Sequence, residues 1–135
     1  MRMRIAAFSL LSFVLQTGHA GAVVTAADSP IASMDKDQAK RVFMGHEPQV
    51  SGVNLLVLYQ KNEAVAGDFE TKVLGKTGDD LAAYWSKLVF TGKAAAPVDV
   101  ADDTAVKSKI ASSHNAIGYV SDAGIDGTVK VLFKY

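Results

Sequence analysis

The sequence offers few side chains at spacings that would support catalysis or metal binding. Its three histidines, His19, His46 and His114, show no metal-ligand spacing. The run Ser112-Ser113-His114 joins hydroxyls to an imidazole, but a nucleophile also needs an orienting acid and an oxyanion site, and no G-x-S-x-G elbow accompanies it. Neither a metal site nor a serine nucleophile is therefore expected.

Two acidic pairs, Asp79-Asp80 and Asp102-Asp103, are the candidates for general acid and base chemistry. Adjacent residues on a helix do not face each other, and both pairs stand where a helix is expected to begin. Helix capping and a favourable interaction with the helix dipole explain them. The sequence therefore predicts a protein that is not an enzyme and that has no catalytic residue, metal or cofactor.

The N-terminus, residues 1–22, has the form of a secretory signal peptide. Two arginines precede an apolar run over residues 5–15, which is too short to span a membrane, and a small-residue cleavage site follows. We expect cleavage after Ala22, with Ala20 as the alternative, and hence a periplasmic protein. Retention of this segment as a membrane anchor is the competing interpretation.

The remainder, residues 23–135, is long enough for a single domain with a modest core but too short for two. Acidic and basic residues are equal in number over the whole chain, so the loss of two arginines with the signal leaves a net charge of −2. Nucleic acid and anionic membranes are poor partners for this domain, because its net charge is slightly negative. Because the sequence has no cysteine, packing alone must stabilise the domain.

Strands and helices alternate along this domain. The expected strands lie at residues 23–26, 53–59, 115–120 and 128–133. The expected helices run from Ser33 or Asp35 to Gly45, from Asn62 to Gly75, from Thr77 to about Gly92, and from Asp102 or Asp103 through Ile110. The alternation predicts an α/β fold with a mixed or mostly parallel sheet of about four strands flanked by about four helices.

Tyr84 and Trp85 are the apolar residues with a second interpretation. They are adjacent on the helix expected at residues 77–90, so together they span about 100° of its circumference. Core packing explains both, but the alternative is that one of them is exposed and forms an interaction surface for another protein.

Four strings along the chain, taken in order, carry a family resemblance. They lie at residues 33–45, which end in RVFMG, at 69–75, at 81–92, which contain YW and VFTG, and at 115–120, which read NAIGYV. They resemble the phosphate-specific periplasmic solute-binding proteins of ABC importers and their single-lobe relatives, with Asn115 where that family usually has glycine. The resemblance covers most of the domain and implies one lobe of a type 2 periplasmic-binding-protein-like fold.

The resemblance also points to a ligand site. In full-length members, this lobe contributes an arginine after the central strand and a Ser-Gly-Thr turn, which together hold phosphate. Here the stretch contains Gln60, Lys61 and Asn62, with neither the arginine nor the turn. Glu63 would compete with an anion for the helix N-terminus. We expect Asn62 to cap the helix, and tight phosphate binding by this chain alone is not expected.

Three functions remain open. The first is an exported, non-enzymatic binding or accessory protein that recognises a small anion or other small solute weakly, with the phosphate ligands largely missing. The second is a periplasmic protein-interaction or sensor-input module that docks on a membrane protein or on a copy of itself. The third is the phosphate-binding component of an ABC importer. A lone lobe lacks the interlobe cleft that buries most of a small ligand, which favours the docking role.

Overall fold

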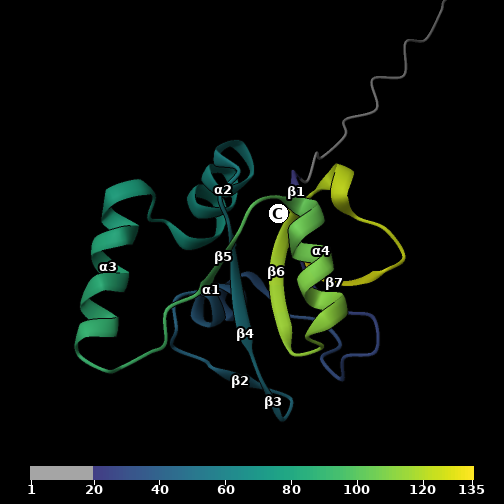
Figure 1. Cartoon of the computed structure of the whole chain (residues 1–135), viewed down its shortest axis with the longest axis horizontal. Helices are drawn as coiled ribbons and strands as arrows, with labels where there is room; N and C mark the ends of the chain where they lie inside the picture. The colour runs from purple at the N-terminus through teal and green to yellow at the C-terminus, as the bar shows by residue number, and fades with distance from the viewer. Residues whose placement is uncertain (1–19) are drawn as a thin grey trace, which may run out of the picture.

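The computed structural model describes residues 20–135, which form a five-stranded sheet with helices on both faces (Figure 1). The strands of this sheet are β1 (Gly21–Ala26), β4 (Leu56–Gln60), β5 (Val98–Val100), β6 (Ala116–Ser121) and β7 (Val129–Lys134). Their order across the sheet is β5-β4-β6-β1-β7. Most of the predicted signal peptide, residues 1–19, lies outside the described residues.

The sheet is mixed, as predicted. β4 runs parallel to β5 and to β6, whereas β1 is antiparallel to β6 and to β7. The additional strand is β5, which holds three residues directly after Pro97. A strand that short has no alternating pattern by which the sequence would reveal it.

One edge of the sheet collects the ends of several elements. β4, β5 and β6 end there, and β1 begins there because Gly21 pairs with Ser121 in the antiparallel register. The backbone N–H of Ala20 donates to the carbonyl of Tyr135 at 2.7 Å, so both ends of the described chain lie at this edge. We call it the carboxyl edge (Figure 1).

The helical elements are α1 (Lys36–Phe43), α2 (Glu63–Phe69), the π-helical turn η1 (Glu70–Leu74), α3 (Gly78–Phe90), α4 (Asp103–Ser112) and the short 3-10 helix η2 (Asp122–Gly124). Asp35, Asn62 and Asp102 cap α1, α2 and α4, each accepting a bond from the backbone N–H three residues later. Gly75 ends η1 in the left-handed conformation expected of a C-terminal glycine. Within residues 20–135, no helix has both the length and the apolar content needed to cross a membrane.

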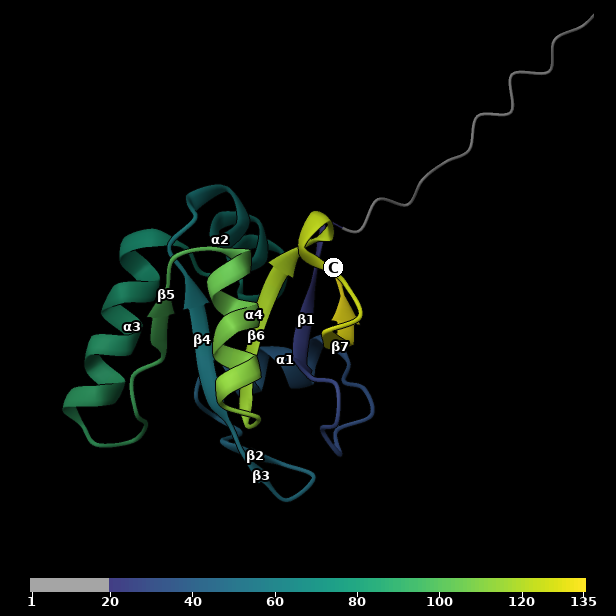
Figure 2. The ribbon, with the colours of Figure 1, turned by 45° about the vertical axis from the view of Figure 1, so that its right-hand side comes forward.

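Helices lie on both faces of the sheet (Figure 2). Their packing creates two hydrophobic cores. α1, α2 and η1 cover one face, and α4 covers the other through Val106 and Ile110. Gly118 of β6 permits the close approach of α4, since a Cβ atom there would lie 2.8 Å from Cγ1 of Val106. A larger residue at position 118 would push α4 away from the sheet.

An aromatic cluster occupies the core beneath α1 and α2. It consists of Phe43, Tyr59, Phe69 and Tyr119. The rings of Phe69 and Tyr119 stack with centroids 3.9 Å apart, and Phe43 meets Phe69 edge-on at 4.9 Å. Since these residues come from α1, β4, α2 and β6, the cluster joins both helices to the middle of the sheet.

A two-stranded hairpin precedes β4. β2 (Gln49–Val50) pairs with β3 (Val53–Asn54), and the turn residues Ser51 and Gly52 both have positive φ angles, 49° and 80°. The sequence predicted a loop up to Gly52 and one continuous strand over residues 53–59. The strand is divided because its first two residues pair back on β2, whereas the rest joins the main sheet.

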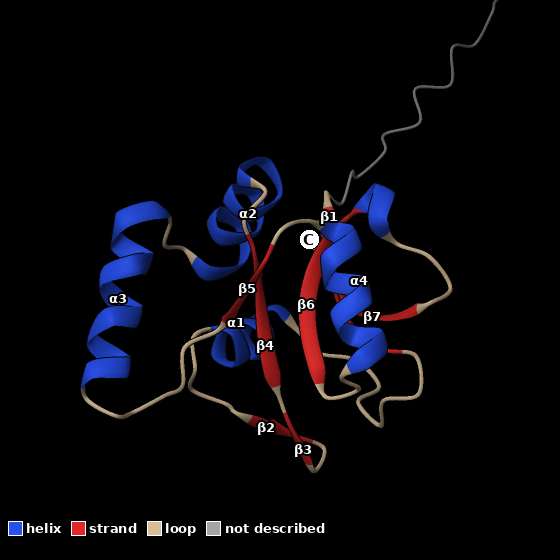
Figure 3. Cartoon of the chain, viewed as in Figure 1, coloured by secondary structure: helices blue, strands red, loops and turns tan. Residues whose placement is uncertain are grey.

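α3 lies beyond β5, at the side of the sheet (Figure 3). Leu81 is its buried residue, whereas Val89 is 45% exposed and Phe90 is 91% exposed. The hydroxyl of Thr77, which the sequence predicted to cap α3, makes no capping hydrogen bond. α3 is therefore attached to the domain along one narrow face.

We expect Phe69→Ala to lower the free energy of unfolding by about 3–5 kcal/mol, the usual cost of removing a buried aromatic ring. Phe90→Ala is the matched control, because Phe90 is almost fully exposed, and we expect its effect to stay within about 0.5 kcal/mol. Urea unfolding followed by circular dichroism measures both variants. Equal losses in the two would contradict the central position of Phe69.

Candidate functional site

The carboxyl edge brings together the residues that the family resemblance placed at a ligand. Gln60 is the last residue of β4 and is 5% exposed, whereas Lys61 and Asn62 are exposed. Asn62 Oδ1 accepts a hydrogen bond from the N–H of Val65 at 3.4 Å, so its side chain caps α2. The backbone N–H of Lys61 donates to the carbonyl of Val100 at 2.8 Å, which ties this loop to β5.

Gln60 uses its hydrogen-bond donors within the protein. Its Nε2 donates to the carbonyl of Tyr119 and to Oδ1 of Asp103, both at 2.7 Å. Its backbone N–H donates to the hydroxyl of Tyr119 at 3.0 Å. Its Oε1 is buried and has no partner among the described residues. The side chain of Gln60 therefore has no free N–H group to offer an anion.

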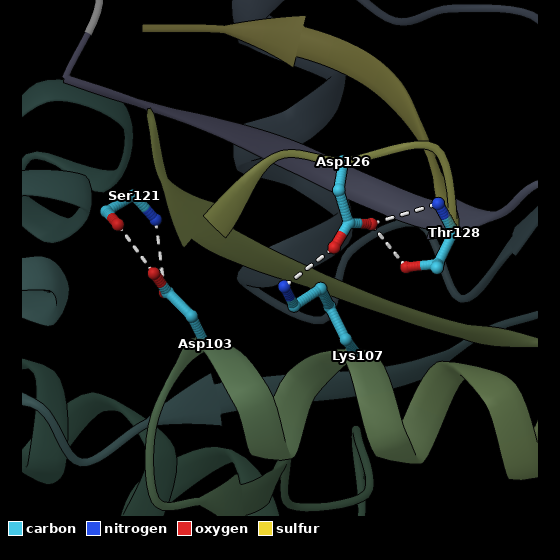
Figure 4. Close-up of polar contacts among 5 residues, drawn as sticks. All are labelled: Asp103, Lys107, Ser121, Asp126 and Thr128. Carbon is cyan, nitrogen blue, oxygen red and sulfur yellow. Dashed lines mark hydrogen bonds and ion pairs between the residues drawn. The ribbon is translucent and has the colours of Figure 1, made fainter. Parts of the chain in front are cut away.

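Asp103 is the residue on which the donors at this edge converge. Besides Gln60, its carboxylate accepts the backbone N–H of Ser121 at 3.1 Å and the hydroxyl of Ser121 at 2.5 Å (Figure 4). Gly124 makes room for it, because a Cβ atom at that position would lie 2.6 Å from Asp103 Oδ2. Asp103 is the first residue of α4, and its carboxylate accepts hydrogen bonds there in the way that a bound anion would at a helix N-terminus.

The sequence did not identify this role. The sequence predicts that Asp102 or Asp103 caps the helix, and the cap is Asp102, whose Oδ1 accepts the N–H of Ala105 at 2.9 Å. With the cap supplied by Asp102, the carboxylate of Asp103 accepts hydrogen bonds from another element, and its partner there is Ser121. That partner could not be named, because Ser121 is brought to Asp103 only by the folding of β6 beside α4.

Negative charge prevails at the first residues of the elements around this edge. The carboxylates there are Glu63 at the first residue of α2, Asp102 and Asp103 at the N-cap and first residue of α4, and Asp122 at the first residue of η2. Lys61 and Lys134 lie near them, and both are exposed to solvent. An added anion would therefore meet repulsion at the helix N-termini, which by themselves would attract it.

A second polar contact fixes α4 to the turn before β7. Asp126 Oδ2 pairs with Nζ of Lys107 at 2.9 Å, and Oδ1 accepts the N–H of Thr128 at 2.9 Å (Figure 4). The bond from the Thr128 hydroxyl, followed by that from Lys107, lowers the pKa of Asp126 to about 2. Because Asp126 is exposed, this contact holds the turn and does not form a ligand site.

Tyr84 and Trp85, the predicted interaction residues, lie half-buried on the side of α3 that faces the domain. The hydroxyl of Tyr84 donates to the carbonyl of Met44 at 2.6 Å and lies 2.9 Å from Nε2 of His46. The indole N–H of Trp85 donates to the hydroxyl of Tyr59 at 3.1 Å. Both side chains therefore attach α3 to the domain, and the exposed apolar residues of α3 lie farther along the helix.

The candidates for catalysis are not brought together by the fold. His114 Nδ1 lies 3.3 Å from Asp28, with both side chains exposed, and the hydroxyl of Ser112 donates to the carbonyl of Lys109. Within residues 20–135, no three histidine or acidic side chains lie close enough together to hold a metal ion.

Comparisons with known proteins agree with this fold. No family model and no curated protein matches the chain. Among solved structures, an ABC-type phosphate transport receptor from Vibrio cholerae is similar over 84% of this chain, with a TM-score of 0.67 and 16% identity. A protein from Clostridium perfringens, described as a putative phosphate ABC transporter substrate-binding protein with bound phosphate, is also similar over 84% of this chain. Its TM-score is 0.66 and its sequence identity is 17%.

PstS from Borrelia burgdorferi is also similar over 84% of this chain, with a TM-score of 0.59 and 13% identity. The similarity covers 45%, 44% and 46% of the three proteins, so this chain spans less than half their length. At these identities the comparison establishes the fold. The predicted resemblance to one lobe of the phosphate-binding proteins is thereby confirmed at the level of structure.

Proposed function

We propose that this protein is an exported, non-enzymatic binding or accessory module that has the fold of one lobe of a phosphate-binding protein but does not itself bind phosphate tightly. The observation that carries the proposal is the environment of Asp103. Its carboxylate already accepts the donors of Gln60 and Ser121 at the carboxyl edge. A solute or a partner must therefore be recognised by other groups.

The magnitudes favour this conclusion. A helix N-terminus attracts a negative charge by about 0.3–1 kcal/mol at an exposed site. Two unit charges of the same sign about 4 Å apart repel each other by about 4 kcal/mol at an effective dielectric constant of 20. With Asp103 in place and Glu63 nearby at the start of α2, repulsion outweighs attraction for a phosphate placed at this edge.

Export is supported by the form of residues 1–22, and the structure of β1 bears on the cleavage site. Gly21 and Ala22 pair with Ser121 and Val120. Cleavage after Ala22 would remove these two residues from β1, whereas cleavage after Ala20 keeps the strand whole. We therefore propose the alternative site, after Ala20.

Mass spectrometry of the exported protein tests this choice. We expect a mass that corresponds to a first residue Gly21, because the mature chain then keeps the complete β1 pairing. A mass that begins at Val23 would support the original assignment, and an uncleaved chain would support a retained anchor.

Isothermal titration with inorganic phosphate tests the main proposal. We expect no binding by the wild-type protein up to millimolar phosphate. Asp103→Ala frees the donors of Gln60 and Ser121 and removes a charge, so weak binding should appear. Asp102→Asn, which keeps both the cap and Asp103, should remain silent. Micromolar binding by the wild type, abolished by Gln60→Leu with Lys61→Ala, would instead support the phosphate-binding component of an ABC importer.

A second candidate function is a protein-interaction or sensor-input module in the periplasm. It is favoured by the exposure of Val89 and Phe90 at the end of α3, because large apolar side chains exposed side by side often mark a contact surface. Tyr84 and Trp85 would support that surface from within by fixing α3 to the domain.

This candidate predicts that the protein forms dimers or is retained on envelope membranes, and that Phe90→Ser abolishes the association. Analytical ultracentrifugation measures dimer formation, and membrane flotation measures retention on the membranes. Ser86→Ala, an exposed change on the same helix, serves as the control. A wild-type protein that is monomeric and absent from the membranes would rule out the candidate.

A further inference from the structure

An open groove lies between α3 and β5. Figure 1 shows these two elements next to each other at one side of the sheet. We call it the α3–β5 groove. Its volume is about 340 Å³, within the range of small-ligand sites. Its wall contains the aromatic residues Tyr59 and Trp85, the acids Glu70 and Asp99, and apolar residues that include Leu81 and Pro97.

The charge of the groove has one sign. Glu70 and Asp99 line it, and no lysine, arginine or histidine is among its lining residues. Neither acid belongs to an ion pair within residues 20–135. Glu70 is half-buried, and this burial raises the pKa of its carboxyl, so its negative charge is poorly solvated. A positively charged group in the groove would compensate that cost.

The aromatic wall favours the same kind of ligand. The planes of Tyr59 and Trp85 are inclined at 84° with centroids 6.2 Å apart, so the two rings form a corner. The indole N–H and the Tyr59 hydroxyl bond to each other, and the hydroxyl also donates to the carbonyl of Phe43. With these polar groups satisfied, the partly exposed indole of Trp85 gives the groove an aromatic, apolar wall, and such a wall attracts organic cations.

We propose that the α3–β5 groove binds a small organic cation, an ammonium or guanidinium group on a short aliphatic chain. Glu70 and Asp99 supply the opposite charge, Trp85 supplies the aromatic contact, and Leu81 and Pro97 pack against the aliphatic part. Anions are excluded by the two carboxylates. A bare metal ion is disfavoured, because the groove has two acidic ligands and large apolar walls.

Trp85 is the single tryptophan of the sequence, so its fluorescence reports on the groove directly. We expect titration with 1,5-diaminopentane to change the emission in a saturable manner, with an affinity that falls as salt increases. The neutral analogue 1,5-pentanediol has the same chain length and should cause no saturable change. No saturation with the diamine, or equal responses to diamine and diol, would overturn the proposal.

Substitutions test whether the carboxylates of Glu70 and Asp99 bind the diamine. Glu70→Gln and Asp99→Asn should each weaken diamine binding on the order of fivefold, the loss of one partly exposed ion pair. Asp37→Asn, an exposed acid on α1 outside the groove, is the matched control and should bind as the wild type does. Because Asp99 is exposed, its variant should fold even if Glu70→Gln does not. An unchanged diamine affinity in Asp99→Asn would contradict the role given to Asp99. These diamine measurements do not depend on the outcome of the phosphate titration.

Discussion

The contact on which most of this structure depends is the stacking of Phe69 on Tyr119. It places α2 over the middle of the sheet. The hydroxyl of the same Tyr119 accepts a hydrogen bond from the backbone N–H of Gln60. The neighbouring Tyr59 holds the end of α1 through its hydroxyl and receives the indole N–H of Trp85. One aromatic cluster therefore sets the positions of both the carboxyl edge and the α3–β5 groove, although its rings belong to the core.

At the carboxyl edge, the hydrogen-bond donors of this chain are bound within the protein. Proteins with this fold include one solved with bound phosphate. In this chain the donors at the ends of β4 and β6 are directed at Asp103, which is covalently part of the protein. An internal carboxylate has no entropy of association to overcome, so a free anion competes with it at a disadvantage. The hydrogen-bond donors of Gln60 and Ser121 are thus satisfied without a ligand.

The sequence predicted the fold class, the four helices and three of the caps, because periodicity and capping residues are local signals. It missed β5 and the β2–β3 hairpin, whose strands are too short to show a pattern. At the candidate site the sequence pointed to Gln60, Lys61 and Asn62 as ligand-binding residues, and this stays a prediction; all three lie at the carboxyl edge. The sequence expected Glu63 to be the competing acid, whereas the donors of the edge are bonded to Asp103. The contact between Asp103 and Ser121 joins residues 18 positions apart, and no local rule predicts it.

The distribution of charge connects the carboxyl edge with the groove. Carboxylates dominate the starts of α2 and α4, and they are the charged residues lining the α3–β5 groove. If this lobe had been selected to hold anions, at least one of these two surfaces should present an unpaired guanidinium or ammonium group directed inward. Instead the buried amide of Gln60 is bonded to an acid, and the half-buried Glu70 has no ion-pair partner within residues 20–135. Such a surface favours cationic ligands, or protein partners with basic groups, over the phosphate bound by a structural neighbour.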